Sequence, residues 1–238
     1  MNTTMKRLYL PLNPVGTTGM KALSAMLETN MTLQVIDLRT TFIDSQIAAR
    51  ALGQALVENK SLVELKLSGN CAINFSHHLA YALQFNACLR KLFLCSTHVG
   101  NDGAIALANA LEINRTLQIL DLTDCQVGQV GAIALAQKAV SGNEILEELH
   151  LVDNPMEEAG SHALLNALKD NKRLRRPTFD TAQKEELKYW NRLTPCGRAM
   201  LKTDLTCALI AKLLHRVSAH GGANSLFLVL TERPDLVA

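Results

Sequence analysis

Residues 89–114 read LRKLFLCSTHVGNDGAIALANALEIN, and this stretch decides the fold. Leucines stand at its first, fourth and sixth positions, and the alternation from Leu92 to Leu94 is typical of a short strand with one buried face. Its second half, which ends in Leu111 and Asn114, has small and apolar residues at helical spacing. The stretch therefore predicts a strand, a turn and a helix.

The same frame recurs along the chain at intervals of 27 to 29 residues. A fixed period of this length is the mark of a solenoid, in which each unit buries its apolar face against its neighbours. An Asn, Thr or Cys follows each of the first six strands, where its side chain can bind backbone groups that the turn leaves unpaired. The residues that open the units are Met5, Leu33, Leu62, Leu89, Leu117, Leu146 and, as a seventh start, Leu174.

A helix is expected in the second half of each unit, where leucines four positions apart share one helix face. The second of these two columns holds Leu27, Leu56, Leu83, Leu111, Ala139 and Leu168. An asparagine follows each helix, and because Asn tolerates the left-handed conformation, we expect that conformation there. These asparagines are Asn30, Asn59, Asn86, Asn114, Asn143 and Asn171.

Together these patterns predict an α/β fold, a right-handed curved solenoid of six repeats with a parallel inner sheet and outer helices. We expect residues 1–176 to form the solenoid. Residues 177–238 are expected to form a helical C-terminal cap or tail, which serves either as a cap alone or also as a recruitment module. The repeat frame is lost after Leu174. The helices expected in the tail span 180–193, 204–217 and 224–230.

These units resemble the leucine-rich repeats of the ribonuclease-inhibitor subtype. The resemblance covers about Met5 to Leu174 and rests on both halves of the unit, including the G-A-x-A-L-A-x-A-L helix of Gly103–Leu111. It implies a protein-binding scaffold, as in ribonuclease inhibitor itself, in the sensor arrays of NOD-like receptors and in the Ran GTPase-activating protein.

Composition and motifs argue against catalysis, metal binding and membrane insertion. The chain has no phosphate loop, no G-x-S-x-G and no H-E-x-x-H motif, and its seven histidines do not cluster at metal-ligand spacing. No apolar run approaches membrane-spanning length. Six cysteines without CxxC pairs predict reduced thiols in a cytoplasmic or nuclear protein. We therefore expect no enzymatic activity, no cofactor and no metal.

The surface most suited to binding is the concave face of the predicted sheet. Side chains that alternate with the inward leucines face solvent there, and strands about 4.8 Å apart bring them into a continuous ribbon. The ribbon mixes charges of both signs with aromatic side chains, which is typical of protein recognition. The residues predicted to bind a partner are Tyr9, Asp37, Arg39, Lys66, Phe93, Asp121 and His150.

The sequence thus favours a non-catalytic protein–protein interaction scaffold or adaptor with a protein partner of unknown identity. Nucleic-acid binding is not expected, because aromatic residues are few and do not alternate with basic ones. Two alternatives stay open: a GTPase regulator resembling the Ran activator, although the tail here is basic rather than acidic, and the sensing part of a NOD-like receptor. The first repeat has almost no cap before it, which predicts either a truncated array or self-association through this edge.

Overall fold

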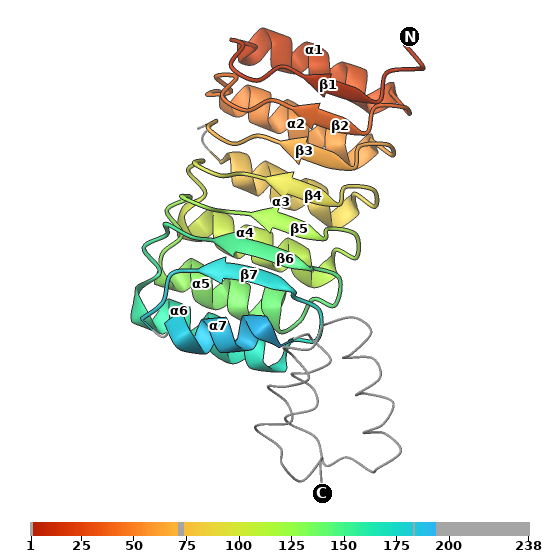
Figure 1. The fold of residues 1–238 in the computed structure, drawn as a ribbon. Coiled ribbons are helices and arrows are strands. Elements are labelled where there is room, and N and C mark those ends of the chain that lie inside the picture. The colour runs from red at the N-terminus through yellow and green to blue at the C-terminus, as the bar shows by residue number, and fades with distance from the viewer. Residues whose placement is uncertain (1, 71–73, 183, 194–238) are drawn as a thin grey trace, which may run out of the picture.

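The computed structural model describes residues 2–70, 74–182 and 184–193, along which strands and helices alternate (Figure 1). The strands are β1 (Arg7–Tyr9), β2 (Val35–Asp37), β3 (Glu64–Lys66), β4 (Lys91–Phe93), β5 (Ile119–Asp121), β6 (Glu148–Leu151) and β7 (Arg176–Phe179). The helices are α1 (Gly16–Thr29), α2 (Gln46–Glu58), α3 (Phe75–Phe85), α4 (Gly100–Ile113), α5 (Gln129–Leu135), the π-helix η1 (Ala136–Val140), α6 (Glu157–Asp170) and α7 (Lys184–Arg192).

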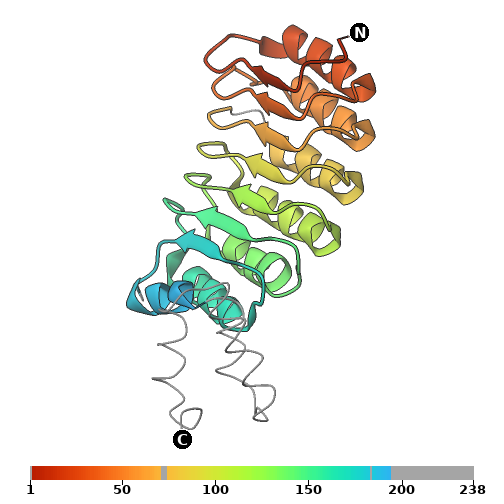
Figure 2. The ribbon, with the colours of Figure 1, turned by 45° about the vertical axis from the view of Figure 1, so that its right-hand side comes forward.

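The strands form one parallel sheet in chain order, from β1 to β7. Figures 1 and 2 show this sheet as one wall of the molecule and the row of helices α1 to α6 as the other. Equivalent residues of successive repeats lie opposite one another, so that Leu8 faces Ile36 and Ile36 faces Leu65. The predicted α/β solenoid with a parallel sheet is confirmed.

The core lies between the sheet and the helices. The unit-opening leucines from Leu33 to Leu174 are buried, and so are inward leucines of the helices such as Leu107. Small residues let neighbouring helices approach closely, since a Cβ added at Gly53 would lie 2.9 Å from the carbonyl oxygen of His78 in the next helix. Each repeat therefore completes the core of its neighbour, as expected of a solenoid.

The asparagines that follow the helices are extended, so the predicted left-handed conformation is wrong. Asn59, for example, has φ −67° and ψ 134°. Its Oδ1 accepts bonds from the backbone N–H groups of Ser61 and Leu62, at 3.0 and 2.7 Å. Its Nδ2 donates to the carbonyl of Leu27 in the preceding repeat, at 2.7 Å. The side chain, rather than a left-handed backbone, thus satisfies the groups at the helix end. The same pattern is made by Asn86, Asn114, Asn143 and Asn171.

Left-handed residues occur instead in the turns that follow the strands. Their N–H groups reach the next repeat, as where Thr40 N donates to the carbonyl of Ser68 at 2.9 Å. The polar residue one position on also binds the turn, as the sequence predicted: Thr41 Oγ1 donates to the carbonyl of Leu38, at 2.7 Å. The non-glycine left-handed residues of these turns include Leu12, Thr40, Ser96, Asp124 and Asp153.

In the fifth repeat, the residue that takes the place of the second helix leucine lies one position later than the sequence alignment predicts. Eight positions separate Leu135 from the following Asn143, whereas seven separate the equivalent pair in the other units. The π-helix η1 absorbs this extra residue. As a result Val140, and not Ala139, supplies the carbonyl that the asparagine of the next unit binds, here Asn171.

The sequence suggests that the repeat frame stops after Leu174. In the structure the frame continues beyond this residue. Strand β7 pairs with β6 and places Pro177 opposite Leu149 and Phe179 opposite Leu151. Both β7 residues are buried, so a proline and a phenylalanine take the leucine positions. The sheet therefore crosses residue 177, and the division into a repeat region and a separate tail stays a prediction.

The first helix expected after the repeats is present as α7, but it begins at Lys184 and not near Asp180. Asp180 has a different role, because its carboxylate accepts a bond from the N–H of Asp153 at 2.7 Å. The other helices expected in the tail, 204–217 and 224–230, lie outside the described residues.

Candidate functional site

The solvent-facing side of the sheet, called the sheet face below, carries the residues predicted to bind a partner. Because the strands pair in register, six of these residues stand in one row across the sheet, and Arg39 lies beside the row, two residues after Asp37. A second row beside the first begins with Arg7 and Val35 and includes Lys91 and Ile119. The main row consists of Tyr9, Asp37, Lys66, Phe93, Asp121 and His150.

Near the N-terminal end of the row, Asp37 forms an ion pair with Arg39. The carboxylate is buried, and the Arg39 guanidinium binds it through Nε at 2.9 Å and Nη2 at 2.7 Å. Burial alone would raise the pKa of Asp37, but the hydrogen bonds and charge of Arg39 hold it below its usual value. The side chain of Arg39 is half exposed, so this pair presents a fixed cation to solvent.

The centre of the sheet face combines an aromatic ring with a cluster of charges. Lys66 Nζ lies 5.7 Å from the centroid of the Phe93 ring, within cation–π range. Glu64 forms ion pairs with Lys66 at 3.1 Å and with Lys91 at 3.8 Å. Ile119 stands next to Lys91 and diagonal to Phe93. Sequence reasoning did not select Glu64, Lys91 or Ile119, although their position in the repeat frame placed them on this face.

Acidic groups stand on the C-terminal side of Phe93. Asp121 lies directly opposite Phe93 in the register and accepts a bond from the N–H of Thr123 at 3.0 Å. No ion pair joins Asp121 to any cation of the residues that the structure describes. Further along, Glu148 lies 3.5 Å from His150 and 3.6 Å from Arg176.

The ring of Phe93 therefore has cations on one side and an uncompensated acid on the other. Lys66 precedes it in the row and Asp121 follows it. We call the five residues at this position the central cluster, and they are Lys66, Lys91, Phe93, Ile119 and Asp121. This arrangement offers an apolar contact between charges of opposite sign.

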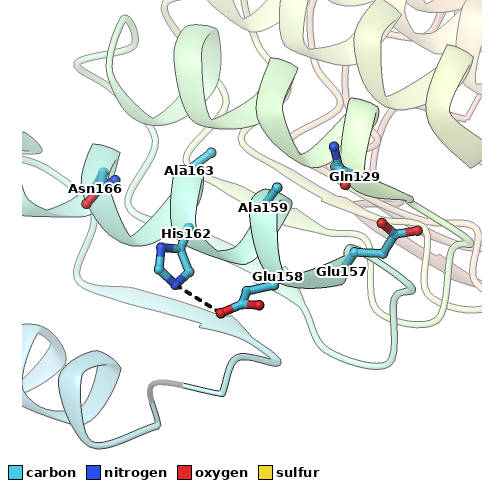
Figure 3. A pocket seen from close by; sticks show the side chains of 7 residues that line it. All are labelled: Gln129, Glu157, Glu158, Ala159, His162, Ala163 and Asn166. Atoms are coloured by element: carbon cyan, nitrogen blue, oxygen red, sulfur yellow. Dashed lines mark ion pairs between the residues drawn. The ribbon is translucent and has the colours of Figure 1, made fainter.

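A second concave region lies on the helical side, between α5 and α6 (Figure 3). It is a groove of about 720 Å³ whose lining includes Gln129 of α5 and Glu158, His162 and Asn166 of α6. His162 lies 3.7 Å from Glu158, and both side chains are exposed. Among the described residues no group of three His, Cys, Asp or Glu side chains could hold a metal ion. Nor is any described helix both long and apolar enough to cross a bilayer.

Comparison with known protein families identifies the repeats. A family model described as "Leucine Rich repeat" matches residues 2–24 and 114–136. Together with the parallel sheet and its outer helices, these matches define a leucine-rich repeat protein. The ribonuclease-inhibitor subtype stays a prediction. A search of curated proteins finds no sequence that matches the chain.

Three solved structures are similar to this chain at low sequence identity. Leiomodin-1 Actin-Binding Site 2 has a TM-score of 0.54 and 19% identity, covering 71% of this chain and 95% of that one. The C-terminal domain of Caenorhabditis elegans tropomodulin has a TM-score of 0.47 and 16% identity, covering 71% and 84%. Human trophoblast glycoprotein has a TM-score of 0.43 and 19% identity, covering 84% and 67%. The similarity to the leiomodin-1 structure is a similarity of fold alone.

Proposed function

We propose that this chain is a non-catalytic interaction scaffold that binds a protein partner on its sheet face. The observation that carries the proposal is the central cluster, where Phe93 lies between Lys66 and Asp121. Aromatic side chains are enriched at the centres of protein interfaces, where a few residues supply most of the binding energy and the surrounding rim is polar.

The shape of the sheet face supports a protein or peptide partner over a small molecule. Seven strands about 4.8 Å apart make a ribbon about 30 Å wide, which is the scale of a protein contact. Small-molecule sites are instead enclosed and mostly apolar. The ribbon is open and carries fixed charges, including the pair of Asp37 and Arg39 and the pair of Glu64 and Lys66.

The solved structure with the same fold in leiomodin-1 is described as an actin-binding site. At 19% identity this likeness supports a protein-binding role for the fold and does not transfer the partner. Purified actin is nevertheless a defined probe for a first binding assay with this chain. A partner captured from lysate and then identified and purified is the second probe.

The test is the dissociation constant of a purified partner for the full chain and three variants. Phe93→Ala removes the central ring, and we expect binding to weaken about tenfold or more, the loss typical of a hot-spot residue. Asp121→Ala should weaken binding less. Tyr81→Ala is the control, because Tyr81 is an exposed aromatic residue on helix α3, away from the sheet. If both sheet-face variants bound as tightly as the control, the proposed site would be wrong.

A further inference from the structure

The charged residues of the sheet face are divided by sign between its two halves. From β1 to β4, the strands and the turns that directly follow them carry four cations and two carboxylates. From β5 to β7 they carry five carboxylates and one arginine, besides His150. The charged residues of the first half are Arg7, Asp37, Arg39, Glu64, Lys66 and Lys91, and those of the second half are Asp121, Asp124, Glu148, Asp153, Arg176 and Asp180.

Four carboxylates of the second half lack a paired cation. No lysine, arginine or histidine of the described residues forms an ion pair with any of the four. In the first half, by contrast, Asp37 is paired with Arg39, and Glu64 is shared by two lysines. We call the four unpaired groups the acidic edge, and they are Asp121, Asp124, Asp153 and Asp180.

Hydrogen bonds hold the acidic edge together. Asp124 and Asp153 occupy equivalent positions in the turns after β5 and β6, and strands about 4.8 Å apart bring such positions close. The N–H of Asp153 donates to the Asp180 carboxylate at 2.7 Å, and Ser96 Oγ donates to the Asp124 carboxylate at 2.9 Å. Like charges at neighbouring positions repel one another. The acidic edge is therefore a fixed region of negative potential that a positively charged partner would relieve.

The backbone of the turns does not account for these carboxylates. Asp124 and Asp153 are left-handed, with φ 52° and 59°, and aspartate tolerates this conformation. The equivalent Thr40 and Ser96 of earlier repeats adopt it without a charge, and asparagine tolerates it equally well. Asp180 is not left-handed. The backbone thus favours a short polar side chain in these turns but does not require a negative charge.

The spacing of the acidic edge suits several separate cations and not a single metal ion. Among the described residues, no three His, Cys, Asp or Glu side chains could hold one ion together. The carboxylates are instead spread along the last three strands of the sheet, and three of the four are exposed. Lysine and arginine side chains of a protein surface are cations that can be spread in the same way.

We propose that the partner of the sheet face presents a segment of divided charge, basic where it covers the acidic edge and acidic where it covers the cations of β1 to β4. The proposal depends on the proposed function, since it takes the sheet face as the binding surface. An apolar side chain between the charged ends of the segment contacts Phe93 and Ile119, which stand in the middle of the sheet. Charge complementarity fixes the orientation of the segment, because the reverse orientation brings like charges together.

Peptide selection on the full chain tests the proposal with a defined probe. Random peptides of about 12 residues, long enough in extended form to cross the sheet, are displayed on phage and selected on the immobilised protein. Peptides that also bind the Phe93→Ala variant are removed. We expect the remaining peptides to carry lysine or arginine toward one end, aspartate or glutamate toward the other, and an apolar residue between them.

One selected peptide, made synthetically, is then titrated against two double variants. Asp124→Asn with Asp153→Asn removes two charges and keeps side chains that tolerate the left-handed turns, and we expect the dissociation constant to rise about fivefold. Glu28→Gln with Glu58→Gln is the matched control, because it removes two exposed carboxylates from helices α1 and α2. It should leave the dissociation constant unchanged. Circular dichroism should show that both double variants fold as wild type does.

Photocrosslinking of the same peptide tests its orientation. A photoreactive group at the basic end should form adducts within β5 to β7, and one at the acidic end within β1 to β4. Adducts in the reverse order, selected peptides without a basic end, or equal affinity for both double variants would each overturn the divided-charge segment while leaving the sheet face as a binding surface. If no peptide distinguished wild type from Phe93→Ala, the proposed function would be wrong as well.

Discussion

At the scale of single residues, the asparagines between repeats contribute more than their place in the sequence suggests. The chain places an Asn after the helix of each of the six repeats, and that regularity predicts a structural role. The sequence alone does not show what this role is. Asparagine is favoured both at helix ends with a left-handed backbone and in extended turns that its side chain holds by hydrogen bonds. In the structure each amide joins two successive repeats. The asparagines are therefore cross-links between units.

Asn59→Ala should strongly destabilise the fold. The variant loses bonds to Ser61 N, Leu62 N, Leu27 O and Asn30 O, all in a buried turn. Because each buried group left without a partner costs about 1–3 kcal/mol, we expect the free energy of unfolding to fall by at least about 3 kcal/mol. Urea unfolding followed by circular dichroism measures this.

Asn109→Ala, at an exposed position of α4, should change stability by less than about 0.5 kcal/mol. Equal effects of the two changes would refute the role of Asn59.

Arg39→Ala should lower stability in a pH-dependent way. In wild type the pKa of Asp37 is lowered, so its contribution to stability is present above the unfolded pKa and is lost as pH falls through the folded pKa. Without Arg39, burial raises the pKa of Asp37, and the loss begins at higher pH.

We expect the Arg39→Ala variant to be about 1 kcal/mol less stable at pH 7, with the difference shrinking as pH falls toward 3, because the carboxyl is protonated in the variant before it is protonated in wild type. Urea unfolding between these pH values gives the comparison. Arg90→Ala, which removes another exposed arginine, should show no such pH dependence. A difference that stayed constant with pH would mean that Arg39 does not act through Asp37.

At the scale of the elements, the sequence predicted strands and helices well because each is repeated six times in the same register. Leu65 and Leu67, for example, alternate with solvent-facing residues just as Leu92 and Leu94 do. The sequence-based prediction failed where one repeat departs from the others. Nothing in the pattern indicated the π-helix that shifts Val140 into the leucine column, since an inserted residue can be absorbed in a turn as readily as in a helix.

Strand β7 was missed for a related reason. Proline and phenylalanine replace the two inward leucines, and Pro usually argues against a central strand. At the edge of a sheet the missing N–H costs no ladder bond, so Pro177 is tolerated. The alternation of buried Pro177 and Phe179 was the signal that could have revealed this strand.

Helix packing gives a prediction at this scale. Gly53→Ala would increase the helix propensity of α2 by up to about 1 kcal/mol. The added Cβ would, however, lie 2.9 Å from the backbone carbonyl oxygen of His78. We expect the packing cost, about 1–3 kcal/mol, to exceed the gain, so that thermal unfolding occurs at lower temperature.

Gly19→Ala is the comparison for Gly53→Ala. The atom nearest to a Cβ at Gly19 is a side-chain methyl of Val15, at 2.8 Å, at the edge of the solenoid. That side chain can move, so the loss should be smaller. A Gly53→Ala protein more stable than wild type would show that the helices are not in close contact there.

At the scale of the whole molecule, the repeat frame predicted which residues share a face but not how they interact. The row from Tyr9 to His150 follows from spacing alone, because a parallel sheet in register aligns equivalent positions. The burial of Asp37 beneath Arg39 and the ion pairs of Glu64 depend on side-chain conformation, which a single sequence does not specify. The central cluster consequently emerged only from the three-dimensional arrangement.

Site-specific photocrosslinking tests most directly whether the sheet face is the binding surface. A photoreactive phenylalanine analogue replaces Phe93 in one protein and Tyr81, on the helical side, in a second. Each protein is mixed with the purified partner, irradiated and analysed by mass spectrometry. The account predicts a covalent adduct with the partner from position 93 and none from position 81. An adduct from position 81 alone would place the partner on the helices and contradict it.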